Sequence, residues 1–208
     1  MLLVGYQINS MSSNTLDIYL DTETTGIDVY NDEIIQAYFE VYNQGELVDT
    51  YELLSSVRKW SFEAEAVHGI SQRKAMSYPS KNRAYFSFLR WLPTNFRFIT
   101  YANKNTIHGC INFDVAMLQN ELDLQGYSMY YLQHNYLMKP ALSVHDIVKK
   151  LKKKIGIKGS LSQENVYKHL FDDEYNAHNA VDDVKALVRI HRRLIELEHE
   201  DQSILTLC

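Results

Sequence analysis

The densest group of residues that could do chemistry is Asp21-Thr22-Glu23-Thr24-Thr25-Gly26, which directly follows a short apolar run. If that run is a β-strand, residues 21 and 23 point to the same face, because side chains alternate along a strand. Two carboxylates on one face repel each other unless a cation lies between them. An all-oxygen pair suits Mg²⁺ or Mn²⁺, although an Asp-x-Glu pair alone is more often a solvated strand end.

Two later segments add candidate groups. Asn112-Phe113-Asp114 opens an expected helix, where an aspartate is also favoured simply because it stabilises the helix N-terminus. His178 and Asp183 lie at the start of the last long expected helix. Four acidic residues and one histidine in this order are much harder to dismiss as caps and solvated ends than any one of them alone.

The elements that must position these groups follow from hydrophobic periodicity. The expected strands are 16–20, 33–42, 46–54 and 96–101, with the second and third joined as an antiparallel hairpin through 43–45. The expected helices are 62–92 with breaks at Gly69 and Tyr78-Pro79, then 113–122, 144–155, 161–171 and 180 to about 199. The stretch 125–141 carries no clear pattern. A three-strand meander followed by strands interleaved with helices indicates an α/β fold with a mixed sheet.

Length and composition favour one soluble globular domain. The chain has 208 residues, of which 46% are hydrophobic and 23% charged, with only 3 prolines and 8 glycines to build a linker. The net charge of −5 excludes a general basic coat for nucleic acid, though not a local basic patch. No apolar run approaches the ~20 residues that span a bilayer, and two cysteines without a pairing pattern, Cys110 and Cys208, favour a reducing intracellular compartment.

Taken together, Asp21-Thr22-Glu23, Asp114, and His178 followed by Asp183 resemble the DEDDh (DnaQ-like) family of 3′–5′ exonucleases, which includes bacterial proofreading subunits and related repair exonucleases. The segment 66–70, Ala-Val-His-Gly-Ile, is a weaker match to a family segment that faces the substrate. The resemblance runs from about Asp17 to Leu194. It implies a single domain, residues 1–208 with a core of about 14–198, and a ribonuclease H-like fold: a three-strand antiparallel meander plus parallel strands, flanked by helices.

The resemblance also implies the site's catalytic and metal-binding roles. Asp21, Glu23 and Asp183 would hold one divalent cation, Mg²⁺ or Mn²⁺, and Asp21 with Asp114 would hold a second. Two such ions suit in-line displacement at phosphorus. His178 would be the general base, because an imidazole can accept a proton from water near neutral pH.

Other positions receive weaker assignments. Thr24 and the run Val67-His68-Gly69 are implied to contact the terminal nucleotide, while a purely structural role for His68 has equal weight. The family spacing selects Asp183 rather than Asp182, which could only support its neighbour indirectly. The stretch 102–111 is longer than the usual family turn, so His108 receives no catalytic role.

The implied reaction removes nucleoside 5′-monophosphates from a nucleic acid with a free 3′ end, with DNA, and single-stranded DNA in particular, favoured as substrate. An RNA-trimming exonuclease shares this chemistry and would differ in how it treats the 2′-hydroxyl. A non-catalytic nucleic-acid-binding module is disfavoured because all five expected catalytic residues are present. The sequence leaves open whether the chain works alone, beside a polymerase or with other nucleic-acid-processing proteins.

One basic segment could contact phosphates outside the site. The run Lys149-Lys150-Leu151-Lys152-Lys153-Lys154 falls in an expected helix whose apolar residues share one face. A solvated helix exterior is the favoured interpretation, and phosphate binding is the alternative.

Overall fold

A computed structural model describes residues 15–101, 112–127 and 139–205 of the chain; His108 and both cysteines lie outside these ranges. Its centre is a five-stranded sheet with the order β3-β2-β1-β4-β5. The strands are β1 (Leu16–Thr24), β2 (Ile34–Asn43), β3 (Glu46–Leu54), β4 (Phe96–Thr100) and β5 (Lys139–Ser143). The first three form an antiparallel meander, whereas β4 pairs parallel to β1 and β5 parallel to β4.

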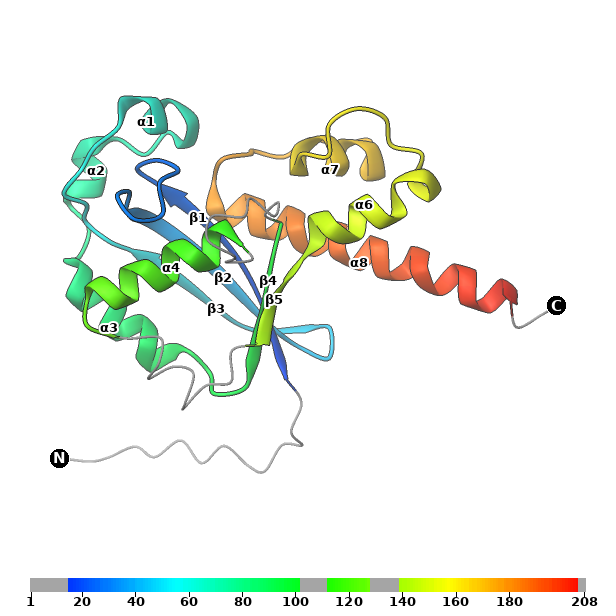
Figure 1. The fold of residues 1–208 in the computed structure, drawn as a ribbon, viewed down its shortest axis with the longest axis horizontal. Helices are drawn as coiled ribbons and strands as arrows, with labels where there is room; N and C mark the ends of the chain where they lie inside the picture. Colours follow the sequence, from blue (N-terminus) through cyan, green and yellow to red (C-terminus); the bar gives the residue numbers. More distant parts are fainter. Residues whose placement is uncertain (1–14, 102–111, 128–138, 206–208) are drawn as a thin grey trace.

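Helices cover both faces of this sheet (Figure 1). The described helices are α1 (Phe62–His68), α2 (Gln72–Met76), α3 (Lys81–Trp91), α4 (Phe113–Leu124), α6 (Val144–Ile155), α7 (Gln163–Phe171) and α8 (Ala180–Leu205). Helices α3 and α4 lie on one face, and α8 lies on the other with α6 and α7 packed against it. Within the described ranges, no helix combines the length and the apolar character that crossing a bilayer requires.

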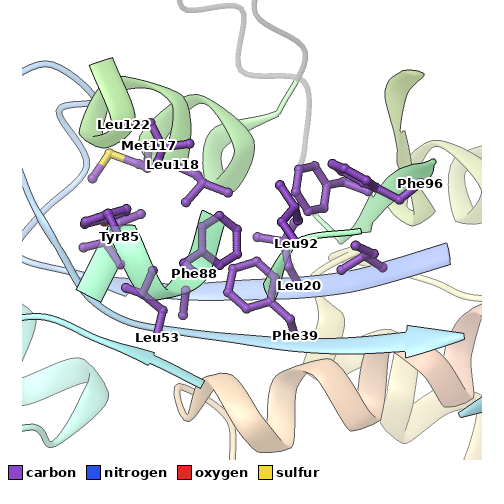
Figure 2. Packing of buried hydrophobic residues seen from close by; sticks show 14 of the residues in the cluster. Leu20, Phe39, Leu53, Tyr85, Phe88, Leu92, Phe96, Met117, Leu118 and Leu122 are labelled. Carbon is purple, nitrogen blue, oxygen red and sulfur yellow. The ribbon is translucent and has the colours of Figure 1, made fainter. Parts of the chain in front are cut away.

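Alternation along β1 divides the core into two clusters. Ile18 and Leu20 are fully buried among the side chains of α3 and α4, together with Phe39, Phe88 and Met117 (Figure 2). The intervening residue, Tyr19, belongs to the opposite cluster, which the α6, α7 and α8 side chains complete. The strand therefore sends even-numbered residues towards α4 and odd-numbered residues towards α8.

A buried ion cluster ties α4 to the sheet. Lys81 at the start of α3 lies 2.8 Å from Glu33 and also pairs with Glu121 of α4, and all three side chains are less than 10% exposed. Glu121 accepts a hydrogen bond from the main-chain nitrogen of Ile34 at 3.1 Å. Removing one member of such a group leaves a buried charge without its partner, so this cluster holds the C-terminal half of α4 against the sheet.

The mixed α/β fold, the antiparallel meander and the two helical breaks are confirmed. The main differences from expectation are two boundaries and one additional strand. Strand β1 continues to Thr24, so the Asp-x-Glu pair lies inside the strand rather than beyond its end. Strand β5 was not predicted, because the residues around it show no clear alternation of apolar and polar side chains. Helix α8 continues past the expected end at residue 199 to Leu205.

Candidate active site

The central strand β1 places two carboxylates where the sheet opens. Its parallel pairing with β4 ends at Tyr19, whereas its pairing with β2 continues through Glu23. Among the described residues, the last part of β1 therefore has no paired strand on the β4 side. This place lies at the carboxyl ends of the parallel strands, where ligands of open α/β sheets commonly bind. By the alternation described above, Asp21 and Glu23 point towards α8, and Thr22 points towards α4.

Helix α8 brings a third carboxylate to the same place. Its first residue follows Asn179, whose side-chain oxygen accepts hydrogen bonds from the main-chain nitrogens of Val181 and Asp182 and so caps the helix. Asp183 lies in this first turn, and one oxygen each of Asp21, Glu23 and Asp183 lies within 4.8 Å of the other two. Asp182 does not join the group; its carboxylate accepts instead from Asn176 at 3.3 Å.

The fourth carboxylate, Asp114, approaches from the opposite helix layer. Asn112 caps α4 by accepting from the main-chain nitrogens of Asp114 and Val115. The Thr22 hydroxyl donates to Asp114 Oδ1 at 2.7 Å. Thr22, which lies between Asp21 and Glu23 in the strand, therefore orients the Asp114 carboxylate. Asp114 is only 6% exposed. It is not part of the three-carboxylate group, but its charge raises the pKa of both Asp21 and Glu23.

Burial and mutual repulsion dominate the electrostatics of the four carboxylates. Burial is the main cause that raises the pKa of Asp21 well above its usual range, and the charges of the other three add to it. Burial, with Asp183 and Asp114, raises the pKa of Glu23 to about 7. Burial likewise raises the pKa of Asp114 to about 6, although the Thr22 hydrogen bond opposes the shift.

This donor set fits divalent cations. Carboxylate oxygens are hard ligands that suit Mg²⁺ and Mn²⁺, whereas the group has no thiolate or imidazole among its three members. No cationic side chain is hydrogen-bonded or ion-paired to any of the three in the part of the chain that the structure describes. Bound cations would remove the repulsion that raises these pKa values.

His178 lies immediately before the cap of α8. Its backbone has a φ of +62°, a left-handed conformation that is uncommon for residues other than glycine and that recurs at functional sites. Its side chain is 54% exposed, with Nε2 3.8 Å from Glu164 Oε1 of α7. A positive charge on His178 would favour the ionised form of Asp183. Burial lowers the pKa of His68, and His178 adds to that shift, so the imidazole of His178 is within electrostatic reach of both residues.

The expected substrate-contacting residues lie at the end of β1 and at the end of α1. Val67 is 56% exposed near the end of α1, and Gly69 ends that helix with a φ of +70°. His68 Nδ1 accepts from the main-chain nitrogen of Ile70 at 3.0 Å, which supports the structural role that the sequence left open. The Thr24 hydroxyl donates to the main-chain oxygen of Gly26 at 2.6 Å, so it also has a local structural partner.

Gly26 lies where a side chain would not fit. A Cβ at this position would lie 2.4 Å from the carboxylate of Asp32, and the backbone of Gly26 is not left-handed. The Asp32 carboxylate accepts from Thr25 and from the main-chain nitrogen of Asp28. The glycine thus permits a close approach that closes the loop after β1.

A protein-family comparison shows the class of protein to which this chain belongs. The family model described as RNase_T, Exonuclease, matches residues 18–191, which include all the candidate catalytic residues. The chain belongs to this exonuclease family. Its fold and its acidic residues place it with the DEDDh-type 3′–5′ exonucleases, as the sequence motifs predicted. A comparison with curated protein sequences finds no significant match.

Solved structures of exonucleases share the fold. Escherichia coli exonuclease I, in a zinc-bound complex with single-stranded DNA, is 17% identical with a TM-score of 0.70 over 88% of this chain and 42% of its own. Cell-death related nuclease 4 is 18% identical with a TM-score of 0.66 over 89% of this chain and 65% of its own. Exonuclease I from Methylocaldum szegediense is 17% identical with a TM-score of 0.68 over 87% and 40%. The chain thus spans about two-fifths of the length of the exonuclease I structures.

The exonuclease site also contains residues that sequence reasoning missed. Thr22, Gln163 and Tyr175 donate hydrogen bonds to the candidate metal ligands. Alternation could have placed Thr22 on the face opposite Asp21 and Glu23, but its contact with Asp114 comes from the structure. Gln163 and Tyr175 belong to no recognisable motif, and only the packing of α7 against α8 brings them to the site.

Proposed function

We propose that this exonuclease removes nucleoside 5′-monophosphates from the 3′ end of DNA, with single-stranded DNA preferred. The observation that carries the proposal is the convergence of Asp21, Glu23 and Asp183 at the open end of β1. Asp114 and His178 act electrostatically on members of that group, which supports a role for both in the same site. The preference for DNA is supported by the single-stranded DNA bound in a structure that shares the fold.

The chain's own residues divide the work between holding cations and moving a proton. Asp21, Glu23 and Asp183 would hold one divalent cation, Mg²⁺ or Mn²⁺, and Asp21 with Asp114 a second. When bound, the two ions would supply Lewis-acid catalysis to the phosphodiester hydrolysis. His178 would accept a proton from the attacking water while the water oxygen forms its bond to phosphorus. The bond from phosphorus to the 3′ oxygen breaks, and that oxygen takes up a proton from solvent.

The terminal nucleotide would lie between β1 and the end of α1. Val67 is exposed and can contact a base or sugar through its methyl groups, while Gly69 lets the backbone approach closely. Thr24 and His68 would contribute main-chain contacts, since their polar side-chain atoms already have local partners. One domain, with its core at about 14–198, would carry the whole site.

The test is a nuclease assay of the purified chain on matched oligonucleotides. Single-stranded DNA, duplex DNA and RNA carrying a 5′ label would each be incubated with Mg²⁺, Mn²⁺ or EDTA. We expect a ladder of shortening single-stranded DNA that needs the cation and stops at a 3′ phosphorothioate. Faster shortening of RNA than of DNA would favour the alternative, an RNA-trimming exonuclease. Cuts within a circular single strand would contradict exonuclease action. Activity of the chain alone would show that no polymerase partner is required.

A further inference from the structure

Asp183 is the most closely held of the candidate metal ligands. The Tyr175 hydroxyl donates to its Oδ1 at 2.8 Å. The main-chain nitrogen of Asn179 donates to its other oxygen, Oδ2, at 3.0 Å. Both oxygens therefore have a fixed donor before any cation binds.

Gln163 completes this arrangement from a different helix. It is the first residue of α7 and is 8% exposed. Its side-chain nitrogen, Nε2, donates to the main-chain oxygen of Asp183 at 2.8 Å. The same nitrogen lies 3.0 Å from the Tyr175 oxygen and 3.2 Å from Asp183 Oδ1, to both of which it donates. Gln163 thus holds the backbone of Asp183 and, at the same time, the hydroxyl that donates to its side chain.

Tyr175 is itself held by packing. Its ring lies edge-on to that of Tyr167, with centroids 4.9 Å apart, in the segment between α7 and α8. A phenol hydroxyl has one proton to donate and lone pairs that accept. The Tyr175 hydroxyl therefore donates to Asp183 while its oxygen accepts from the Gln163 amide.

We infer that Tyr175 and Gln163 are positioning residues that fix the Asp183 carboxylate for cation binding through Oδ2. An ionised carboxylate offers about four lone pairs, two on each oxygen. The donors from Tyr175 and Gln163 engage Oδ1, whereas Asn179 leaves one acceptor position of Oδ2 open. Without the two side chains, repulsion from Asp21 and Glu23 would turn Asp183 away from the cation position. The inference rests on the proposed function, because it takes Asp183 as a metal ligand.

Calorimetric titration of the substrate-free protein with Mn²⁺ tests this directly. Tyr175→Phe removes only the donating hydroxyl, and Gln163→Met keeps the length of the side chain without its amide. Partners that orient a ligand typically change metal affinity or activity by about 10- to 100-fold, so we expect each variant to bind Mn²⁺ about 10- to 100-fold more weakly. Tyr167→Phe is the matched control, because its hydroxyl bonds to Asp173 rather than to any candidate ligand.

A second measurement separates positioning from general stability. Thermal unfolding in EDTA should be nearly the same for Tyr175→Phe and Tyr167→Phe, and the nuclease activity of Tyr175→Phe should recover as Mn²⁺ is raised. Mn²⁺ affinity of Tyr175→Phe equal to or above that of the unchanged protein would overturn the inference, as would a loss equal to that of Tyr167→Phe. If the unchanged protein binds no Mn²⁺, the proposed function itself fails.

Discussion

At the scale of the residue, Asp183 and His178 are close in sequence, but replacing each of them should impair the enzyme in a different way. Asp183→Ala deletes an oxygen from the three-carboxylate group, so we expect it to abolish activity and weaken Mn²⁺ binding. His178→Ala leaves that group intact and should lower the single-turnover rate by ~10²–10⁴-fold, the usual cost of a lost general base. Rates measured against pH at saturating Mn²⁺ would decide between the roles. A loss of Mn²⁺ affinity in His178→Ala as large as in Asp183→Ala would contradict the assignment of His178 as the base.

Glu23 should make the cation-free protein less stable as pH rises. Burial and its acidic neighbours raise its pKa from 4.5 to about 7 in the folded protein. The folded state therefore binds more protons than the unfolded state between about pH 4.5 and 7, and stability falls as pH rises through that range. At about 1.4 kcal/mol per pKa unit, a shift of this size corresponds to roughly 3 kcal/mol.

Replacing the carboxyl isolates this contribution. Glu23→Gln keeps the shape and removes the charge, so in EDTA it should be more stable than the unchanged protein at pH 8 and similar at pH 5. It should also gain less stability from Mn²⁺. Thermal unfolding in EDTA at both pH values measures the effect as the difference between the two proteins, because burial lowers the pKa of His191 to about 4 and shifts the stability of both in the opposite direction. A difference that does not grow from pH 5 to pH 8 would contradict the argument.

At the scale of the element, α6 offers a test of the lysine run. The lysines of this helix are exposed, and three of them lie in its last turn, where positive charge also stabilises the helix dipole. Lys154 bonds to the main-chain oxygen of Leu197, about 20 Å along α8 from Asp183, because a helix rises about 1.5 Å per residue. Any phosphate that this turn contacts must therefore lie several nucleotides from the scissile end.

Substrate length then distinguishes phosphate binding from a solvated helix face. Exchanging Lys150, Lys152 and Lys153 for glutamine should weaken binding of a long oligonucleotide but not of a trinucleotide. Each lost contact should flatten the log–log salt dependence by roughly 0.7 for single strands. Arg90→Gln on α3, across the sheet, is the matched control. An unchanged slope for the long strand would return these lysines to the favoured interpretation as a solvated face.

At the scale of the whole molecule, cation binding should stabilise the fold. The site joins β1 to helices on both faces of the sheet, and the chain carries a net charge of −5 that two divalent ions would largely offset. A ligand at about 100 times its Kd adds about 2.7 kcal/mol to the free energy of unfolding. We therefore expect Mn²⁺ to raise the unfolding temperature and EDTA to reverse the rise.

Two neighbouring aspartates supply the control for this experiment. Asp183→Asn should lose most of the stabilisation by Mn²⁺, because it removes a carboxylate from the three-carboxylate group. Asp182→Asn should keep it, because Asp182 bonds to Asn176 outside that group. Equal losses in the two variants would show that Mn²⁺ stabilises the protein through general charge neutralisation rather than through this site.

The sequence by itself predicted the fold class and singled out four acidic residues as candidate metal ligands. Alternation in residues 16–20 predicted that Asp21 and Glu23 share a face, and the family motif selected Asp183 over Asp182. These are local properties, since strand alternation, helix periodicity and motif spacing depend on residues a few places apart. Their roles in binding cations and moving protons stay predictions until they are measured.

Only the tertiary structure decided which groups meet and what holds them. Strand β5 was not predicted from residues 125–141, because a short strand at a sheet edge is set by its pairing with β4 rather than by its own pattern. The contact of Thr22 with Asp114 and the bonds from Tyr175 and Gln163 to Asp183 join separate elements. Such contacts carry no sequence periodicity, because they depend on how far each helix extends and at what angle it packs on the sheet.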